Sequence, residues 1–366
     1  MKRILSSILV LGFYFAPVSV NVIAQPSEVQ TQNPQTEEVQ RLLQQARQQM
    51  QQGQPQQAIA TLQQALALAR QLELKDVEAV AILGIGRNYN DIGQRQRALE
   101  FYNQALFIFK VTNNRSGEAV TLNNIGLLYT TIGQPQRALE YYNQSLPIRR
   151  EISDRAGEAA TLNNIAAVYN DTGQPQKALE YYNQALVISR EGEDRSREAT
   201  TLNNIAVVYN DIGQPQKALE YYNQALPIRR EVSDRSGEAT TLNNIGVAYR
   251  AIGQPQKALE YYNQALPIRR EVSDRSGEAT TLNNIAAAYN DIGQPQKALE
   301  YYNQALPIRR EVDDRPGEAA TLNNIGLLYT TIGQSQKALE FCNRALLISR
   351  EVSDRSGEAI ALGNIS

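Results

Sequence analysis

The residues best suited to bind another molecule are asparagines, which recur as adjacent pairs at intervals of 40 residues. An asparagine amide offers both a hydrogen-bond donor and an acceptor, so a row of amides suits the N–H and C=O groups of an extended peptide backbone. The same amides can instead bond between neighbouring copies of the repeated segment, which would make them structural. The sequence leaves both interpretations open. The pairs are Asn123 and Asn124, Asn163 and Asn164, Asn203 and Asn204, Asn243 and Asn244, Asn283 and Asn284, and Asn323 and Asn324.

The composition offers little for catalysis. The chain of 366 residues has no histidine and one cysteine, Cys342, so it has no histidine-based triad, cysteine–histidine dyad or histidine metal site. We therefore expect no enzyme activity, no cofactor and no metal. Cys342 stands where other copies have tyrosine, which predicts a small buried packing residue. The 36 basic and 38 acidic residues give a net charge of −2, which argues against binding nucleic acid through its phosphates.

A strict internal repeat organises the chain. Residues 213–245 recur without change as residues 253–285, and looser copies lie on either side, always displaced by 40 residues. Such a period predicts one supersecondary unit stacked on itself. Within a unit, apolar residues step by three and four positions, which predicts a first α-helix. In one copy these residues are Ala119, Leu122, Ile125 and Tyr129.

Glycine and proline mark a turn between this helix and a second one. Gly133 stands where a left-handed residue ends the first helix, and Pro135 suits the first turn of the second. A second apolar stripe follows and includes Tyr142, the second member of a tyrosine pair, which we expect in the core. A short polar linker leads to the next unit. Asp154, or a serine at the position of Ser236, is the candidate N-cap there.

The spacing of small and aromatic residues resembles the tetratricopeptide repeat. That family has the pattern W-x2-L-G-x2-Y followed by A-x3-F. The matching residues here are Leu122, Ile125, Gly126 and Tyr129, then Ala138 and Tyr142. Leucine replaces the tryptophan, the closing proline is missing, and the unit of 40 residues exceeds the usual ~34. Longer units of this kind are similar to those of kinesin light chains and Pins-type polarity adaptors. The resemblance implies an all-α fold, a right-handed α–α superhelix of eight helix pairs and a terminal half-unit.

The N-terminus predicts export. Lys2 and Arg3 precede an apolar run that is too short to span a membrane. Small residues then occupy the −3 and −1 positions of a cleavage site after Ala24, which is the pattern of a secretory signal peptide. We expect a location in the periplasm or outside a bacterial cell, with no integral membrane segment after cleavage. The expected segments are a signal peptide (1–24), a disordered leader (25–36), an atypical capping unit (37–75), seven units of 40 residues (76–355) and an incomplete ninth unit (356–366).

The resemblance also implies a binding surface, because the first helices of tetratricopeptide arrays line a concave groove that holds a partner peptide. It assigns the asparagine pairs to this groove, and the second member of each pair matches an asparagine of the family. Groove side chains are neutral to acidic, as at Asp211 and Asp291, with apolar residues such as Val207 and Leu327 between them. They suit an extended peptide with small apolar or basic side chains.

We therefore expect a scaffold that binds a protein or peptide. The first helices of the third to eighth units lack lysine, which argues against capture of chaperone C-terminal carboxylates. The alternative function is that of a structural spacer that self-associates, with its uncapped C-terminal unit stacked on another copy.

Overall fold

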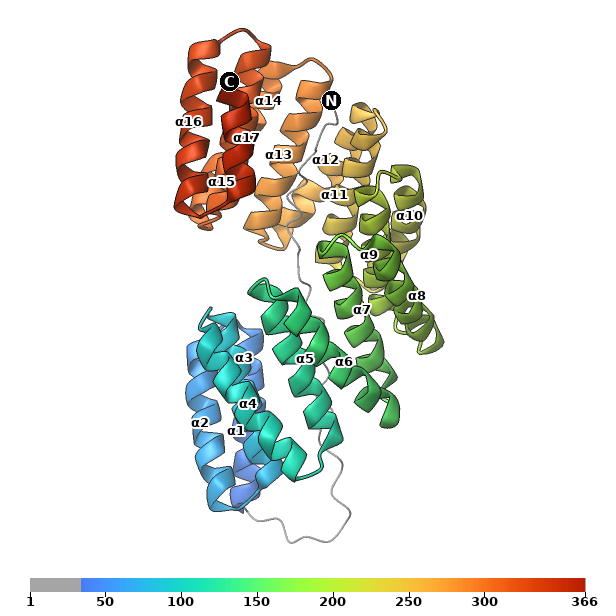
Figure 1. Ribbon diagram of the computed structural model, residues 1–366, viewed down its shortest axis with the longest axis vertical. Helices are drawn as coiled ribbons and strands as arrows, with labels where there is room; N and C mark the ends of the chain where they lie inside the picture. The colour runs from blue at the N-terminus through green and yellow to red at the C-terminus, as the bar shows by residue number, and fades with distance from the viewer. Residues whose placement is uncertain (1–33, 366) are drawn as a thin grey trace. The chain divides into compact units, whose positions relative to one another are not determined.

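The computed structural model describes residues 34–365, which form α-helices joined by short turns, with no strand among them (Figure 1). The expected signal peptide and residues 25–33 of the expected leader lie outside the described residues. The described helices belong to two compact units. The first contains α1 (Pro34–Gln51), α2 (Pro55–Gln71), α3 (Lys75–Asp91), α4 (Arg95–Val111), α5 (Arg115–Thr131), α6 (Pro135–Glu151), α7 (Arg155–Asp171) and α8 (Pro175–Glu191). The second contains α9 (Arg195–Asp211), α10 (Pro215–Glu231), α11 (Arg235–Ala251), α12 (Pro255–Glu271), α13 (Arg275–Asp291), α14 (Pro295–Glu311), α15 (Arg315–Thr331), α16 (Ser335–Glu351) and α17 (Arg355–Ile365).

The helices follow the predicted repeat. Odd-numbered helices are the first helices and even-numbered helices the second helices of eight pairs, and α17 is a single first helix. The prediction of an all-α array of eight pairs and a half-unit is confirmed, while its right-handed sense stays a prediction. α1 begins at Pro34, so the last three residues of the expected leader are helical. Within residues 34–365, no helix combines the length and hydrophobicity needed to cross a membrane.

The turn within each pair is built as predicted. Gly213 has a φ of +74°, in the left-handed region where a side chain would be strained, and the equivalent glycines of all eight pairs share this conformation. Pro215 then occupies the first turn of α10, where its missing N–H has no helical acceptor to lose. Glycine and proline therefore act together as the stop and start signals of consecutive helices.

The turn between pairs contains a left-handed residue that is not glycine. Ser233 adopts a φ of +57° although it is not glycine, and the corresponding residue of every other unit does the same. Asp234 follows as the N-cap of α11, and its Oδ1 accepts a hydrogen bond of 2.8 Å from the backbone N–H of Gly237. The N-cap at the aspartate position is confirmed, whereas the serine alternative is wrong because Ser236 already lies inside the helix.

The core of each pair contains the predicted apolar stripes. Leu242 and Ile245 of α11 are completely buried in one apolar cluster. Tyr262 of α12 is completely buried in the neighbouring cluster. The second tyrosine of every pair is buried, as predicted, and Cys342 is a buried packing residue at the same position. The first tyrosine packs differently, since Tyr261 stacks on Tyr249 with ring centroids 5.3 Å apart.

A chain of ion pairs connects successive units along the edge formed by the linkers. Glu238 is almost fully buried and accepts hydrogen bonds from Arg230 of the preceding pair, at 2.7 Å, and from Arg235, at 2.5 Å. Arg235 also donates to Glu271 at the end of the same pair, at 2.7 Å, and Arg270 begins the next set. The set recurs in each complete pair from α11 to α16. From α11 to α16, each pair is thus joined to the next by charge as well as by apolar packing.

We expect acid to weaken the array at this edge. The hydrogen bond from Arg235 holds the pKa of Glu271 below its ordinary value near 4.5, and Arg195 and Arg275 do the same for Glu231 and Glu311. A lowered carboxyl pKa stabilises the fold above the ordinary value, and this stability is lost as the pH falls through the folded-state pKa. The urea midpoint of helix unfolding should be steady above about pH 5 and fall below it, and high salt should reduce the change. An unchanged midpoint at pH 3 in low salt would contradict this role of the ion pairs.

Candidate functional site

The predicted site residues all lie on first helices, from α5 to α15, and at the same point of each helix. Residues three and four apart share one helical face, so each asparagine pair shares its face with the apolar residue and the polar residues that follow it. On α11 these residues are Asn243, Asn244, Val247, Arg250 and Ala251. The repeat places an equivalent set on each first helix from α5 to α15.

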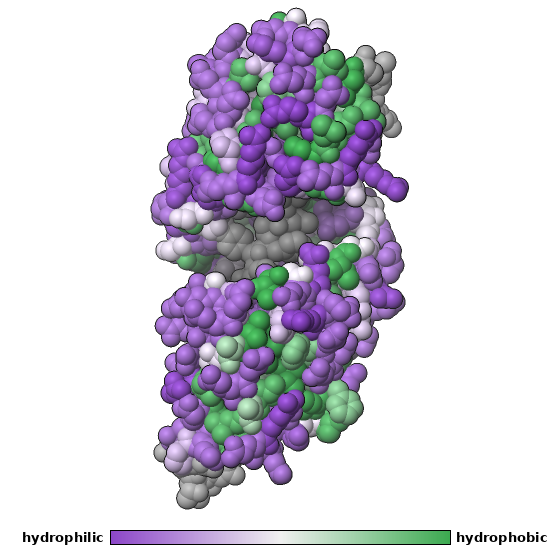
Figure 2. All heavy atoms as spheres, turned by 90° about the vertical axis from the view of Figure 1, so that its left-hand side faces the viewer, coloured by the Kyte–Doolittle hydropathy of each residue, from purple (hydrophilic) through white to green (hydrophobic). Residues whose placement is uncertain are grey.

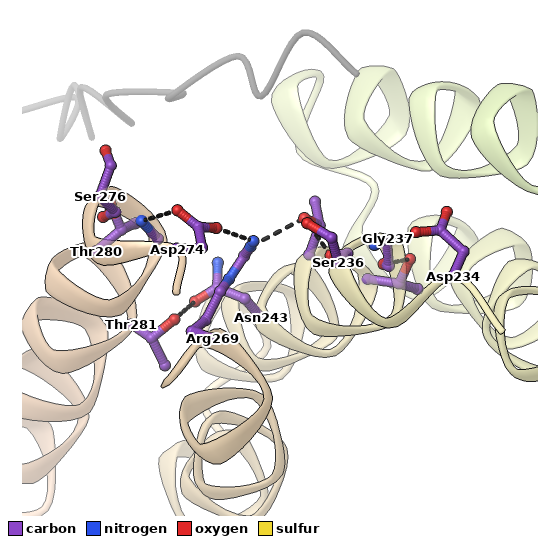
Figure 3. Close-up of polar contacts among 12 residues, drawn as sticks. Asp234, Ser236, Gly237, Asn243, Arg269, Asp274, Ser276, Thr280 and Thr281 are labelled. Atoms are coloured by element: carbon purple, nitrogen blue, oxygen red, sulfur yellow. Dashed lines mark hydrogen bonds and ion pairs between the residues drawn. The ribbon is translucent and has the colours of Figure 1, made fainter. Parts of the chain in front are cut away.

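The first asparagine of a pair bonds to the next unit. Asn243 is buried, and its Oδ1 accepts a hydrogen bond from Asn284 Nδ2 at 3.1 Å. The same oxygen accepts from Thr281 Oγ1 at 3.4 Å (Figure 3). Asn203 likewise accepts from Asn244 and Thr241. The structural interpretation of the asparagines is therefore correct for these atoms. The other bonds of this kind join Asn123 to Asn164 and Thr161, and Asn283 to Asn324.

At α11 and α13 these bonds use half of each amide, whereas on α7 Asn163 Nδ2 also donates to the backbone carbonyl of Ala159, at 3.0 Å. They occupy Oδ1 of the first asparagine and Nδ2 of the second, so Nδ2 of Asn243 and Oδ1 of Asn284 make no hydrogen bond to any residue that the structure describes. One donor and one acceptor therefore remain at this step of the row. The binding interpretation of the asparagines stays a prediction, now confined to these atoms.

The row ends where the sequence changes. Asn323 Oδ1 is buried and has no partner within residues 34–365. On α17, Ala361 replaces the threonine of the third to eighth units, whereas Asn364 keeps the position of the donating asparagine.

Apolar side chains accompany the asparagines. Leu327, one turn after its pair, is 49% exposed, and Val207 and Val247 are half-buried. A large aliphatic side chain in water is a contact available to a ligand. Among the described residues, no group of three or more histidine, cysteine, aspartate or glutamate side chains is placed to hold a metal ion.

One residue of this face was missed by sequence reasoning. Arg250 stands where the equivalent residues are asparagine or threonine, and its Nε donates to Asp291 Oδ2 of the next first helix at 2.5 Å. The available signal was its departure from the repeat, which is visible only when the copies are aligned by their 40-residue period. The equivalent residues are Thr130, Asn170, Asn210, Asn290 and Thr330.

Stacked antiparallel helix pairs with a shared face of first helices define a helical-repeat protein. A family model described as tetratricopeptide repeat matches residues 38–110, 117–191, 157–231, 197–271 and 277–351, so the chain belongs to the tetratricopeptide repeat family. The predicted resemblance is confirmed. Arrays of this family generally mediate protein–protein interaction, and no catalytic family is indicated.

Solved structures share the fold. BtubC (BKLC) from P. vanneervenii is 24% identical, with a TM-score of 0.52 over 61% of this chain and 91% of its own. The apo form of RapI is 19% identical, with a TM-score of 0.62 over 75% of this chain and 99% of its own. A Rap protein complexed with competence and sporulation factor is 18% identical, with a TM-score of 0.60 over 90% of this chain and 97% of its own. A search of curated proteins found no match.

Proposed function

We propose that this protein is a binding scaffold that holds an extended protein segment along the surface of its first helices. The observation that carries the proposal is the row of amide atoms left over by the inter-unit bonds, such as Asn243 Nδ2 and Asn284 Oδ1, which recurs beside apolar side chains. A backbone in extended conformation presents alternating donors and acceptors that match such a row.

The inter-unit bonds favour this function instead of competing with it. Because Asn243 Oδ1 accepts two hydrogen bonds, its amide is held in one orientation before any ligand arrives. A group that is already ordered loses less conformational entropy when it binds, so a given contact contributes more affinity. The Rap protein complexed with competence and sporulation factor shows that an array of similar fold can bind a factor, and we extend this to the present chain as part of the proposal.

The partner is expected to be an extended peptide with small apolar or basic side chains over most of the row. Asp211 and Asp291 are acidic members of the face, and Val207 and Leu327 are apolar ones. Near-identical units also favour a ligand that makes the same contact several times, which raises affinity through effective concentration.

The test compares exposed apolar residues on first and second helices. Peptides are selected from a random-sequence display library on the chain without residues 1–24, and their dissociation constants are measured by fluorescence anisotropy. We expect Leu327→Ser or Val247→Ser to weaken binding by about tenfold, the effect of losing one buried aliphatic contact. The matched variants Val187→Ser and Leu347→Ser, which remove residues of the second helices that are 54% and 65% exposed, should leave affinity unchanged.

The outcome discriminates between surfaces. All four side chains are at least partly exposed, so the variants are expected to fold, which a thermal melt verifies. Loss of binding in the second-helix variants, with none in the first-helix variants, would contradict the proposal.

We further propose that the chain is exported, with cleavage after Ala24. The N-terminal charge and apolar run support this proposal. Mass spectrometry of the protein recovered from the envelope or medium should find Gln25 as the first residue. An intact Met1 would contradict it.

A spacer that self-associates is the second candidate. It is favoured by α17, where Leu362 is 45% exposed although the equivalent Leu242 is completely buried. Apolar side chains also lie among polar ones on the face of the molecule that Figure 2 shows. Light scattering across a concentration series tests it, because a monomer at every concentration would remove this candidate.

A further inference from the structure

Among the first helices that carry an asparagine pair, α5 to α15, one, α11, has a local reversal of charge on the face of that pair. Units five and seven have Asn210 with Asp211 and Asn290 with Asp291, whereas unit six has Arg250 with Ala251. The change from asparagine to arginine adds a positive charge, and the change from aspartate to alanine removes a negative one. Both changes act in the same direction, and the segments on either side, residues 213–245 and 253–285, are identical.

Arg250 is held from one side only. Its Nε donates to Asp291 Oδ2, while its Nη1 and Nη2 groups make no hydrogen bond to any described residue. The side chain is 29% exposed, so these donors are accessible. The aspartate orients the guanidinium through Nε and leaves the two terminal amino groups to another acceptor.

The surroundings of Arg250 contain a second unsatisfied group. The hydroxyl of Tyr262 is buried, has no hydrogen-bond partner among residues 34–365, and lies within electrostatic range of both Arg250 and Asp291. Burial raises the pKa of Tyr262, so the hydroxyl is neutral and remains a potential donor. Burial lowers the pKa of Arg250, but the hydrogen bond and charge of Asp291 raise it by more, so the guanidinium stays charged.

We propose that Arg250 anchors a carboxylate of the segment bound by the scaffold and thereby sets the register of that segment. The proposal rests on the function proposed above. A guanidinium with Nη1 and Nη2 available matches the two oxygens of a carboxylate, and such charge-assisted bonds are among the stronger ones in proteins. The carboxylate belongs either to an aspartate or glutamate side chain or to a C-terminus.

Register needs such a device in this array. Identical units offer a ligand the same contacts after a shift of one unit, so repeated asparagines alone leave its position undefined. At the equivalent position of unit five, Asp211 disfavours a ligand carboxylate, while Arg250 and Ala251 of unit six favour one. Asp291 of unit seven pairs with Arg250 itself. An acidic group in an otherwise neutral or basic segment is therefore accepted at one place.

The experiment measures coupling between Arg250 and individual carboxylates. A peptide selected on the wild-type chain from a display library is resynthesised with each aspartate or glutamate changed to the amide in turn, and separately with an amidated C-terminus. Affinities are measured for the wild type and for Arg250→Asn, a residue that units five and seven already contain at this position. Arg250→Lys serves as a second variant that keeps the charge without the planar fork.

We expect one neutralisation to weaken binding to the wild type on the order of tenfold to a hundredfold, the range of a charge-assisted bond. The same neutralisation should change binding to Arg250→Asn by less than about twofold if the anchor is lost. If changing one internal aspartate or glutamate to its amide weakens binding to the wild type alone, the anchored group is that side chain. If amidation of the peptide C-terminus does so, the anchored group is the C-terminal carboxylate. Arg250→Lys should fall between the two proteins.

Two outcomes contradict different proposals. If every neutralisation has the same effect on the wild type and on Arg250→Asn, the anchor is wrong and the scaffold stands. If no library peptide binds the wild type, the scaffold proposal fails and the anchor fails with it. The comparison can also be made on the wild-type protein alone. The NMR chemical shift of the Arg250 Nε–H should change when the selected peptide binds, and change less when the peptide that lacks the anchored carboxylate binds.

Discussion

Leu242→Ala is expected to lower the free energy of unfolding by about 2–5 kcal/mol, the range for large-to-small changes in a closed core. Leu242 of α11 is completely buried in a cluster with Ile245 and Tyr222, where the surrounding helices cover it on all sides. Removing three carbon atoms leaves a cavity that helix packing fills only in part. Urea unfolding followed by circular dichroism measures the loss, and a multiphasic transition would place it in the units next to α11.

The half-unit supplies a matched control for this variant. Leu362 occupies the same position on α17 and is 45% exposed. Leu362→Ala should therefore cost under about 1 kcal/mol. Equal losses at the two positions would show that Leu362 is covered in solution, which would favour the spacer that self-associates.

Asp274→Ala is expected to cost about 3 kcal/mol, because it removes two interactions at once. Asp274 Oδ1 accepts from the Gly277 N–H at 2.8 Å as the N-cap of α13, and its Oδ2 accepts from Arg269 at 2.5 Å (Figure 3). Arg269 is buried, with a second bond to Thr240 of the preceding first helix at 2.9 Å. Without the aspartate, a buried guanidinium loses its counter-charge. Its Nε already has no partner within the described helices.

The array again contains its own control. Asp354 caps α17 through the same bond to Gly357, at 3.0 Å, but the residue at the arginine position is Ser349. Asp354→Ala should lose only the cap, about 1 kcal/mol. Asp274→Asn should keep the cap and lose the charge, and so fall between the two. If Asp354→Ala and Asp274→Ala are equally destabilising, the buried arginine does not depend on its aspartate.

Sequence reasoning succeeded where one residue type has one structural use. Gly213 and Pro215 predicted a turn because glycine tolerates a positive φ and proline suits the first turn of a helix. The apolar spacing predicted the buried faces, including Tyr262 and the unusual Cys342. These inferences use only local geometry, and the repeat supplied several independent copies of each.

Sequence reasoning failed where distances between units decide. The asparagines had two physically sensible roles, and the choice for Asn243 Oδ1 depends on how far α11 lies from α13. Ser233 gave no glycine-like signal for its left-handed backbone, since the turn between pairs imposes that conformation on serine, aspartate, glutamate and asparagine alike. Arg250 needed a neighbour, Asp291, that lies 41 positions away in the chain.

The linker ion pairs have a consequence for how such a gene changes. Arg230, Glu238 and Arg235 close a junction that is chemically identical to the one made by Arg270, Glu278 and Arg275. Unequal recombination between the DNA copies would delete or insert a whole unit and still leave every arginine opposite a glutamate. A change in the number of units would therefore keep every junction intact, and the number of ligand contacts would change with it.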